Sequence, residues 1–532
     1  MKNNSNIFVP LIAGIALIIG VLMGITLSVG DNTISSNQGS VYAKKLIDVF
    51  NVIEQNYVDE IDKEELMETT ISEMLHRLDP HSNYIPAIEL QRMTESIQGH
   101  FGGVGVRFTI LNDTLSITNV IENSPAHKVG VEKFDQIVTV DGDTIAGIGL
   151  TNSRVQELLK GEAGTVVEVG IKRNNTVIQK KIRRGVVPVN SIVASHMMTG
   201  NVGYIRLSNF SMQSGKEFQT AAKQLLKEGM DKLVFDLRFN TGGVMGAAID
   251  IVDAFLEQGL PIVSTKSKNH PEQIEYSRNR PYLGNVELVV LINQSSASAS
   301  EIVAGAIQDN DRGIIVGRRS FGKGLVQQDI NLKDGSNLRL TTSRYYTPTG
   351  RSIQKPYTGD YEDYLMDEVN RYESGELYAQ DSSLFLDSLK YFTPKGKVVY
   401  GGGGIMPDVF VPLDTSFSSN YFRHLQYTNA FSDFAFIYVK RNRNLQFSSF
   451  QEFDANFKIT PDFLNEFTRY VEQKHSITFR ERDFNYSKSR IIMELKSEIA
   501  RQFWLEDGMF YIRNKSDLEV QKALGLLTNE MI

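Results

Sequence analysis

Residues 286–309 read VELVVLINQSSASASEIVAGAIQD, an apolar run, then small polar residues, then a second apolar pattern. The run from Val286 to Ile292 has the length of a buried strand. Helical spacing follows, at Ile302, Val303, Ala306 and Ile307. A buried strand that leads into a helix is the repeating unit of layered α/β folds.

The same alternation extends in both directions from this stretch. Strand-like runs cover 232–237, 261–264, 286–292 and 313–316, and helical patterns cover 217–228, 244–256 and 298–309. Strands that alternate with helices indicate a sheet covered by helices. The sequence therefore predicts an α/β layered domain.

Ser298 opens the predicted helix. Ser298-Ala299-Ser300-Glu301 is a capping-box pattern, and such a serine is most often only a helix cap. A serine in this place also has the positive end of the helix dipole beside it, and the Ala299 N–H is free to donate to a developing oxyanion. The cap and a nucleophile are compatible interpretations of one residue.

A serine nucleophile needs a neighbouring base. Residues 200–413 contain one histidine, His270, in a polar segment that is typical of a loop. Lys323, in Phe321-Gly322-Lys323-Gly324, is the better candidate, because burial lowers the pKa of a lysine from its ordinary value of about 10.4. Gln327, four residues later, would hold the lysine amine by a hydrogen bond.

Lys323 also fits part of another motif. Gly317 to Lys323 matches the first seven positions of the phosphate-binding GxxxxGK loop. The next position requires Ser or Thr and holds Gly324, and 325–327 is strand-like where a helix is required. Nucleotide binding is therefore disfavoured.

A strand-like run from Leu233 to Arg238 leads into Phe239-Asn240-Thr241-Gly242-Gly243. Paired glycines let backbone N–H groups approach a ligand closely, and they equally suit a tight turn between strand and helix. With Ala299, they would complete an oxyanion hole.

Together these segments resemble the C-terminal processing, or tail-specific, serine proteases. The resemblance implies Ser298 as nucleophile, Lys323 as general base and Gln327 as the residue that orients the lysine. It implies oxyanion donors at Ala299 and at either Gly242 or Gly243, between which spacing does not decide.

Two details qualify the match. Thr241 stands where proline is common in the family, which we expect to be tolerated because both glycines remain. Ser295, Ser296 and Ser300 are chemically possible nucleophiles, and the alignment with the family motif favours Ser298.

The segment 99–186 is β-rich and resembles a PDZ domain. Strand-like runs cover 115–120, 136–140 and 166–172, and Asn152 would cap a helix that ends at Leu159. PDZ domains add an extended peptide to a sheet edge and hold its carboxylate in a nest of backbone N–H groups. The candidate nest is Gly103-Val104-Gly105-Val106, although these glycines equally suit a strand entry.

Composition limits the other functions. The 532 residues are 41% hydrophobic and carry a net charge of −7, which allows two to four folded domains and provides no basic field for nucleic acid. Cysteine is absent, which excludes thiol catalysis, thiolate metal sites and disulfides. We expect no metal and no cofactor.

Residues 7–29 form an apolar run without charge, long enough to cross a bilayer. We expect an uncleaved anchor in the inner membrane, with the rest of the chain on the periplasmic side of the cell envelope; a cleaved signal peptide is the alternative. Helical patterns then follow at 41–57 and 62–78, and these helices are expected to pack or to dimerise.

The remaining segments carry less information. His81, in a stretch that resembles the N-terminal region of the same proteases, is interpreted as structural. The acidic segment 360–387 is interpreted as a solvated insertion. The chain after 413 is rich in Phe, Tyr and charge, and we expect it to be mainly helical and to pack on the core or mediate oligomerisation.

The predicted organisation is a multidomain α/β protein. Its parts are an anchor or signal segment (1–30), a linker with N-terminal helices (31–98), a PDZ-like domain (99–186), a protease core (187–413, with an insertion near 357–398) and a helical extension (414–532). The predicted function is a serine endopeptidase that cleaves unfolded or exported proteins near their C-terminal tails. The alternatives are a non-catalytic peptide-binding scaffold and a lysine-based hydrolase of another acyl compound.

Overall fold

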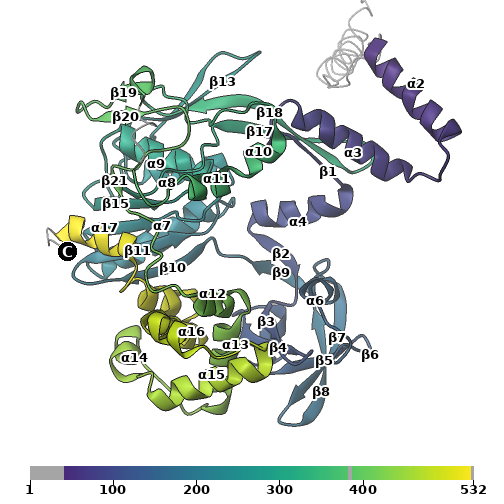
Figure 1. Cartoon of the computed structure of the whole chain (residues 1–532), viewed down its shortest axis with the longest axis vertical. Helices are drawn as coiled ribbons and strands as arrows, with labels where there is room; N and C mark the ends of the chain where they lie inside the picture. Colours follow the sequence, from purple (N-terminus) through teal and green to yellow (C-terminus); the bar gives the residue numbers. More distant parts are fainter. Residues whose placement is uncertain (1–40, 381–385, 529–532) are drawn as a thin grey trace, which may run out of the picture. The chain divides into compact units, whose positions relative to one another are not determined.

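The computed structural model describes residues 41–380 and 386–528 (Figure 1). The predicted anchor at 7–29 lies outside the described residues. Contacts divide the chain into two units, 1–71 and 72–532. In the first unit, α2 (Val41–Asn56) buries none of its residues, so the packing predicted for this helix is not observed.

The first unit also contains most of α3 (Lys63–His76), which begins where the sequence predicts. Asp62 Oδ1 accepts from the backbone N–H groups of Glu64 and Glu65, both at 3.0 Å. The Asp62 side chain therefore caps the start of α3.

A six-stranded, mostly parallel sheet forms the centre of the second unit. In spatial order its strands are β10 (Ile192–Met197), β11 (Val202–Leu207), β12 (Lys232–Asp236), β15 (Glu287–Ile292), β16 (Ile314–Gly317) and β21 (Val409–Phe410). Only the β10–β11 pair is antiparallel. The α/β prediction is confirmed, and the predicted strands agree with the observed ones to within a few residues.

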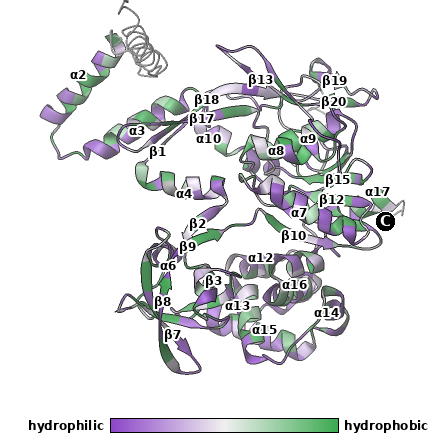
Figure 2. Cartoon of the chain, turned by 180° about the vertical axis from the view of Figure 1, so that it is seen from behind, coloured by the Kyte–Doolittle hydropathy of each residue, from purple (hydrophilic) through white to green (hydrophobic). Residues whose placement is uncertain are grey.

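Helices bury both faces of this sheet. On one face lie α7 (Ser214–Lys227), α8 (Met245–Asp253) and α9 (Ala299–Asp309); Figure 2 colours α8 and α9 as mostly hydrophobic. Leu233 and Phe235 point to this side, whereas Val234 packs on the opposite side against α17 (Leu518–Thr528). Burial on both faces explains why Leu233, Val234 and Phe235 of β12 are all apolar rather than alternating with polar residues.

A second sheet carries the segment after Lys323. Its order is β1 (Asn83–Ile85), β18 (Asn337–Tyr346), β13 (Pro261–Ser267) and β14 (Gln273–Tyr276), and β17 (Leu325–Asn331) pairs with β18. The strand-like interpretation of 325–327 is therefore confirmed.

The chain enters the β-rich module along β2 (His100–Gly103) and leaves it along β9 (Gly185–Pro188). These two strands pair with each other. Its strands are β3 (Val106–Ile110), β4 (Leu115–Val120), β5 (Gln136–Val140), β6 (Asp143–Thr144), β7 (Val166–Arg173) and β8 (Thr176–Arg183), with helices α5 (Pro125–Lys128) and α6 (Asn152–Leu159). The predicted cap of α6 is wrong: Thr151 Oγ1 accepts from the Arg154 N–H at 3.2 Å, one residue before Asn152.

The chain after 413 is helical, as predicted. Its helices are α12 (Asn420–Tyr427), α13 (Ala430–Arg441), α14 (Phe450–Asn456), α15 (Pro461–His475), α16 (Glu481–Arg513) and α17. Residues from α12 to α16 share one aromatic-rich core, while α17 packs on the central sheet. The expected packing on the α/β core is thus found at α17.

The acidic segment is more ordered than predicted. It forms α10 (Tyr361–Leu365) and α11 (Asp367–Glu373), and both Tyr364 and Arg371 are buried. Lys355 pairs with Asp367 at 3.0 Å, and Glu376 accepts from Arg319 at 2.7 Å and from Arg371. Cations thus neutralise Asp367 and Glu376, whereas Glu362, Asp363 and Glu373 are exposed, so the interpretation as a solvated insertion holds for only part of the segment.

Candidate active site

Ser298 lies in the turn between β15 and α9 with a backbone that non-glycine residues rarely adopt. Its φ is 54° and its ψ −112°. Glu301 accepts from the Ser298 N–H at 2.8 Å, the reciprocal half of the predicted capping box. A strained backbone held by its surroundings is typical of a functional turn.

The neighbouring serines differ from Ser298 in what their hydroxyls do. The Ser296 hydroxyl donates to the Leu237 carbonyl at 2.9 Å, and the Ser300 hydroxyl donates to the Asn240 carbonyl at 2.8 Å; both side chains are fully buried. The Ser295 hydroxyl lies 3.5 Å from a Glu368 carboxylate oxygen. Of the four candidates, only Ser298 lines the cavity described next.

This cavity, the active-site cavity, has a volume of about 330 Å³. Its lining includes Ser298, Lys323, Gln327 and Gly243, so the fold brings together residues that lie far apart in the sequence. Apolar side chains form part of the wall, namely those of Ile97, Val244, Met245, Ile302, Leu325 and Val326.

Lys323 is in the environment that the base hypothesis requires. Burial lowers the pKa of its ammonium group, and the positive charge of Arg339 lowers it further. The carboxylates of Glu301 and Asp79 act in the opposite direction. Because the lowering effects dominate, the neutral amine is more accessible than in a solvated lysine.

Glu301 links Ser298 to Lys323. Its fully buried carboxylate accepts from the N–H of Ser298 (2.8 Å) and from that of Lys323 (2.9 Å). Two further donors are the Gly322 N–H at 2.7 Å and the Ser320 hydroxyl at 2.5 Å. Burial raises the pKa of Glu301, and these four hydrogen bonds oppose that effect.

Tyr345, on β18, is a second link between the same two residues. Its hydroxyl lies 3.0 Å from the Ser298 carbonyl oxygen and 2.6 Å from that of Lys323, and donates to one at a time. Burial raises the pKa of Tyr345, so the hydroxyl stays a neutral donor. No sequence pattern indicates a role for Tyr345, and the pattern around Glu301 indicates only a cap.

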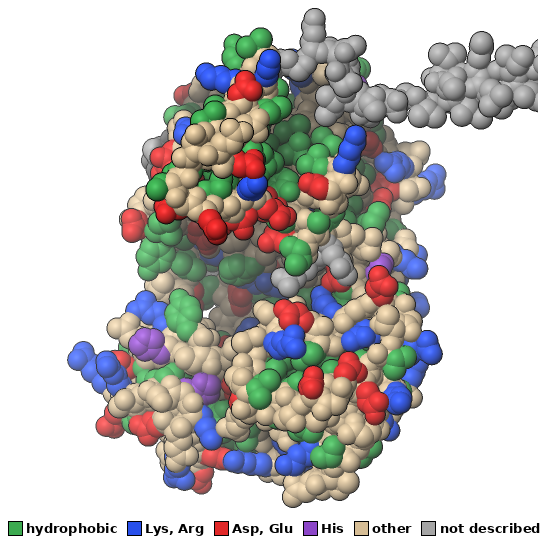
Figure 3. Space-filling model, turned by 90° about the vertical axis from the view of Figure 1, so that its right-hand side faces the viewer, with side chains coloured by type: hydrophobic (Ala, Val, Ile, Leu, Met, Phe, Trp, Pro, Cys, Tyr) green, Lys and Arg blue, Asp and Glu red, His purple; other side chains and the backbone are tan. Residues whose placement is uncertain are grey.

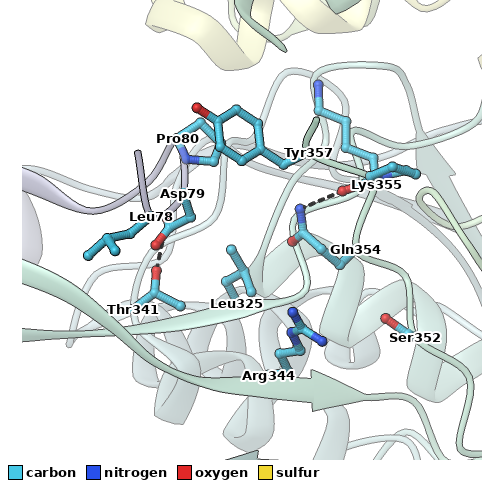
Figure 4. Close-up of a pocket in the computed structure, with 11 residues that line it drawn as sticks. Leu78, Asp79, Pro80, Leu325, Thr341, Arg344, Ser352, Gln354, Lys355 and Tyr357 are labelled. Atoms are coloured by element: carbon cyan, nitrogen blue, oxygen red, sulfur yellow. Dashed lines mark hydrogen bonds between the residues drawn. The ribbon is translucent and has the colours of Figure 1, made fainter. Parts of the chain in front are cut away.

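Gln327 lines the active-site cavity, but its amide bonds to Thr341 rather than to the lysine. Gln327 Nε2 donates to Thr341 Oγ1 at 3.3 Å, and Thr341 Oγ1 donates to Asp79 Oδ1 at 3.1 Å. Figure 4 shows Asp79 and Thr341 directed toward each other beside Leu325, in a neighbouring cavity. The orienting role of Gln327 therefore stays a prediction.

The two glycines are not equivalent. The Gly242 N–H donates to the Asn240 side chain at 2.9 Å, so this donor is already engaged. Within 41–380 and 386–528, neither the Gly243 N–H nor the Ala299 N–H has a protein acceptor. A Cβ on Gly242 would lie 2.7 Å from the Ser298 Cβ, which shows how closely this turn approaches the serine. The geometry favours Gly243 and Ala299 as the oxyanion donors.

His81 lies near the site but is not part of the lining of the active-site cavity. Its Nε2 is 2.8 Å from the Tyr364 hydroxyl. Burial lowers the pKa of His81 to about 3, with a further contribution from Lys323.

Among the described residues no cluster of three or more His, Asp or Glu side chains is suited to a metal ion.

Comparison with known proteins identifies the family of this chain. Residues 201–363 match the model of peptidase family S41. A carboxy-terminal-processing protease from Bartonella bacilliformis is 38% identical over 350 residues, which cover 64% of this chain and 80% of the relative. The chain belongs to the carboxy-terminal processing proteases of peptidase family S41. It is therefore a serine peptidase of the C-terminal processing type.

Two further proteins are similar to this chain. The carboxy-terminal processing protease CtpB of Bacillus subtilis is 32% identical over 319 residues, which cover 58% of this S41 chain and 65% of the relative. A solved photosystem II D1 C-terminal processing protease is 28% identical, over 59% of this chain and 91% of its own, with a TM-score of 0.33.

Further matches cover the segments around the protease core. Residues 102–183 match a PDZ domain, which confirms that assignment. Residues 26–87 match the N-terminal domain of the activating protease CtpB, and 421–506 match a family of unknown function. Within the described parts of the chain, no helix is both long and apolar enough to cross a membrane.

The candidate nest of the PDZ domain has free donors. The carbonyl groups of Val104 and Gly105 accept from the N–H groups of Ala126 (2.8 Å) and Ile121 (3.0 Å). In the described chain the N–H groups of Val104 and Gly105 have no protein acceptor. Gly103 and Val106 flank them as the end of β2 and the start of β3. Free donors next to a positive-φ glycine, Gly105, are typical of an anion-binding nest.

Proposed function

We propose that this S41 peptidase cleaves peptide bonds with Ser298 as nucleophile and Lys323 as general base. The observation that carries the proposal is the active-site cavity, which Ser298, Lys323 and Gly243 line together. The lowered pKa of Lys323 and the hydrogen bonds from both residues to Glu301 support it.

The mechanism is acyl transfer. Neutral Lys323 Nζ takes the hydroxyl proton while Ser298 Oγ bonds to the carbonyl carbon of the substrate. The Gly243 and Ala299 N–H groups donate to the oxyanion. The lysinium then protonates the leaving amine, the C–N bond breaks, and water hydrolyses the acyl-enzyme with Lys323 again as base.

The substrate is an unstructured C-terminal tail with an apolar residue at the cleaved bond. The apolar wall that Val244, Met245 and Ile302 give to the active-site cavity supports this. The free N–H groups of Val104 and Gly105 support capture of the tail's carboxylate by the PDZ domain, with Gly103-Val104-Gly105-Val106 as the peptide-binding segment.

The proposed location is the cell envelope, on the periplasmic side. The uncharged apolar run 7–29 supports export and an inner-membrane anchor. The exposed apolar side chains of α2, such as Leu46 and Ile47, support a homo-oligomer. Nucleic acid is not a proposed partner: on the face drawn in Figure 3, basic and acidic side chains are interspersed.

Digestion of an unfolded test protein by the full chain examines the nucleophile. Ser298→Ala should lower the cleavage rate by about a thousandfold or more, because Ser298 supplies the serine hydroxyl that lines the cavity beside Lys323. Ser295→Ala, three residues away, should retain the parent's rate. Both variants should keep the parent's circular dichroism and melting temperature.

The opposite pattern would overturn the proposal. Cleavage that survives in Ser298→Ala excludes this residue as the nucleophile. A parent that binds peptide tails but cleaves no test protein indicates the alternative function, a peptide-binding scaffold.

A further inference from the structure

A cavity of about 370 Å³ lies where the PDZ domain meets the helical extension. We call it the tail cavity. Strand β3 contributes Arg107 to Ile110 and α6 contributes Asn152. The other wall belongs to the helical extension. Helix α13 contributes Ser432, Asp433 and Phe436, and α16 contributes Glu498, Arg501 and Leu505. No function is known for the family that 421–506 match.

Strand β3 is an edge of the PDZ sheet. Among the described strands it pairs only with β4. Phe108 and Ile110 face the core of the domain, whereas the alternate residues Arg107 and Thr109 face the extension. An incoming strand on this edge would therefore lie between the PDZ core and the extension.

The extension is tied both to the PDZ domain and to the protease core. At a kink in α16, Leu505 has a φ of 54° and a ψ of −143°. The next two residues point to different partners: Glu506 pairs with Arg107 at 2.7 Å, and Asp507 accepts from the Ser195 N–H of β10 at 2.5 Å. Through Glu506 and Asp507, α16 therefore contacts both the PDZ domain and the protease core beside the tail cavity.

The direction of a bound tail follows from the nest. The free N–H groups of Val104 and Gly105 precede β3, so a peptide that ends there and lies along β3 runs antiparallel to it. From Val106 to Ile110 the strand advances by about 13 Å at about 3.3 Å per residue. Residues roughly two to four positions before the end of the tail then enter the tail cavity.

Among the residues that the structure describes, the charges in the tail cavity leave one carboxylate without a cation. Arg107 and Arg501 both pair with Glu506, at 2.7 and 3.1 Å. Arg501 also approaches Glu498 at 3.5 Å, and Arg513 lies 3.4 Å from the same carboxylate. The charges of these arginines and glutamates neutralise one another. Asp433 is the carboxylate of the tail cavity that no arginine neutralises.

In the described parts of the chain, the partners of Asp433 are weak ones. The Thr109 hydroxyl donates to its carboxylate at 3.2 Å, and His475 Nε2 is 3.8 Å away. Burial lowers the pKa of His475, so this imidazole is neutral near pH 7. Burial raises the pKa of Asp433 to about 6, as expected for a carboxylate without a cationic partner.

We propose that the helical extension forms the second wall of the peptide groove and that Asp433 selects C-terminal tails with a lysine or arginine two to four residues before the end. This inference rests on the proposed function, in which the PDZ domain captures substrate tails. It gives the extension a role in substrate choice rather than in chemistry.

Peptide binding tests the inference apart from catalysis. The full chain with Ser298→Ala would be titrated with free-acid peptides that carry Lys, Ala or Glu at the second, third or fourth residue from the end. Fluorescence anisotropy should show about fivefold to tenfold tighter binding of Lys than of Ala at one of these positions, with Glu weakest. An amidated C-terminus should weaken binding of every peptide.

Variants at 433 supply the decisive comparison. Asp433→Asn should reduce the Lys preference to less than about twofold and leave the affinity for the Ala peptide unchanged, because only the charge is lost. Asp433→Glu keeps the charge and should keep the preference, which separates a charge effect from a folding defect. Glu466→Gln, a partly exposed acidic residue of α15 outside the tail cavity, is the matched control.

Three results would overturn the inference: no Lys preference, a preference that survives in Asp433→Asn, or equal binding of amidated and free-acid peptides. If the digestion experiment still identifies Ser298 as the nucleophile, these results leave the proposed chemistry intact. If Ser298→Ala still digests the test protein, the proposed chemistry fails whatever the peptides show.

Discussion

Lys323→Ala should lower proteolysis of an unfolded test protein by about a thousandfold or more and leave the fold intact. The hydroxyl of Ser298 has no histidine to take its proton, and Lys323 is the buried amine that lines the same cavity. Removing the base leaves a hydroxyl that is a weak nucleophile at neutral pH.

Lys323→Arg is the sharper form of this test. Arginine keeps the positive charge and much of the length, yet it does not lose its proton in proteins, so it cannot act as a base. We expect it to be as inactive as Lys323→Ala. Lys333→Ala, an exposed lysine in the β17–β18 turn, is the matched control and should keep full activity. Substantial activity in Lys323→Arg would show that the lysine supplies only charge.

The pH dependence of kcat/KM follows from the same assignment. The active form of Lys323 is neutral, so activity should rise with pH along one limb whose midpoint lies below the ordinary lysine pKa of about 10.4. Arg339 lowers this pKa by repelling the ammonium form, so Arg339→Gln should move the midpoint to higher pH. If Arg339→Gln leaves the midpoint of the pH profile unchanged, the rise in activity reports the titration of a group other than Lys323.

Glu301→Gln should lower kcat by about a hundredfold or more and reduce the melting temperature, although the two side chains have nearly the same shape. All four groups that contact the carboxylate are donors. An amide offers one oxygen, and its NH₂ group would face two of these donors, leaving buried hydrogen bonds unmade at a cost of about 1–3 kcal/mol each.

The loss should appear in kcat more than in KM, because Glu301 holds the N–H groups of Ser298 and Lys323 and lies outside the lining of the active-site cavity. Glu301→Asp, which keeps the charge on a shorter side chain, should recover part of the activity. Glu228→Gln, at the exposed end of α7, controls for loss of a carboxylate. Full activity in Glu301→Gln would exclude a positioning role.

The elements around the site are predictable from the sequence for a physical reason. The strands of the core are buried on both faces and therefore appear in the sequence as continuous apolar runs, as Leu233 to Phe235 illustrate. The motifs that hold Ser298 and Lys323 are local, so short stretches of sequence are enough to reveal them.

The features that sequence patterns do not reveal depend on distant contacts. In the sequence, the position of Glu301 indicates only a helix cap. Its other partners, Ser320, Gly322 and Lys323, come close to it only in the folded chain. Spacing does not separate Gly242 from Gly243, since the difference lies in the hydrogen bond from the Gly242 N–H to the Asn240 side chain.

The same reason explains two departures from the predictions. An acidic segment looks solvated until Arg319 and Lys355 from elsewhere pair with it. The predicted cap of α6 is displaced by one residue, because Thr151 and Asn152 are both good caps and only the backbone decides between them.

The most direct test of the account is to trap the acyl-enzyme. The full chain would be mixed with a peptide ester that has an apolar acyl residue, quenched in acid during turnover and mapped by mass spectrometry. The account predicts the acyl mass on Ser298, and its absence from both Ser298→Ala and Lys323→Arg. An acyl group on Ser295, Ser296 or Ser300, or turnover without any acylated serine, would contradict it.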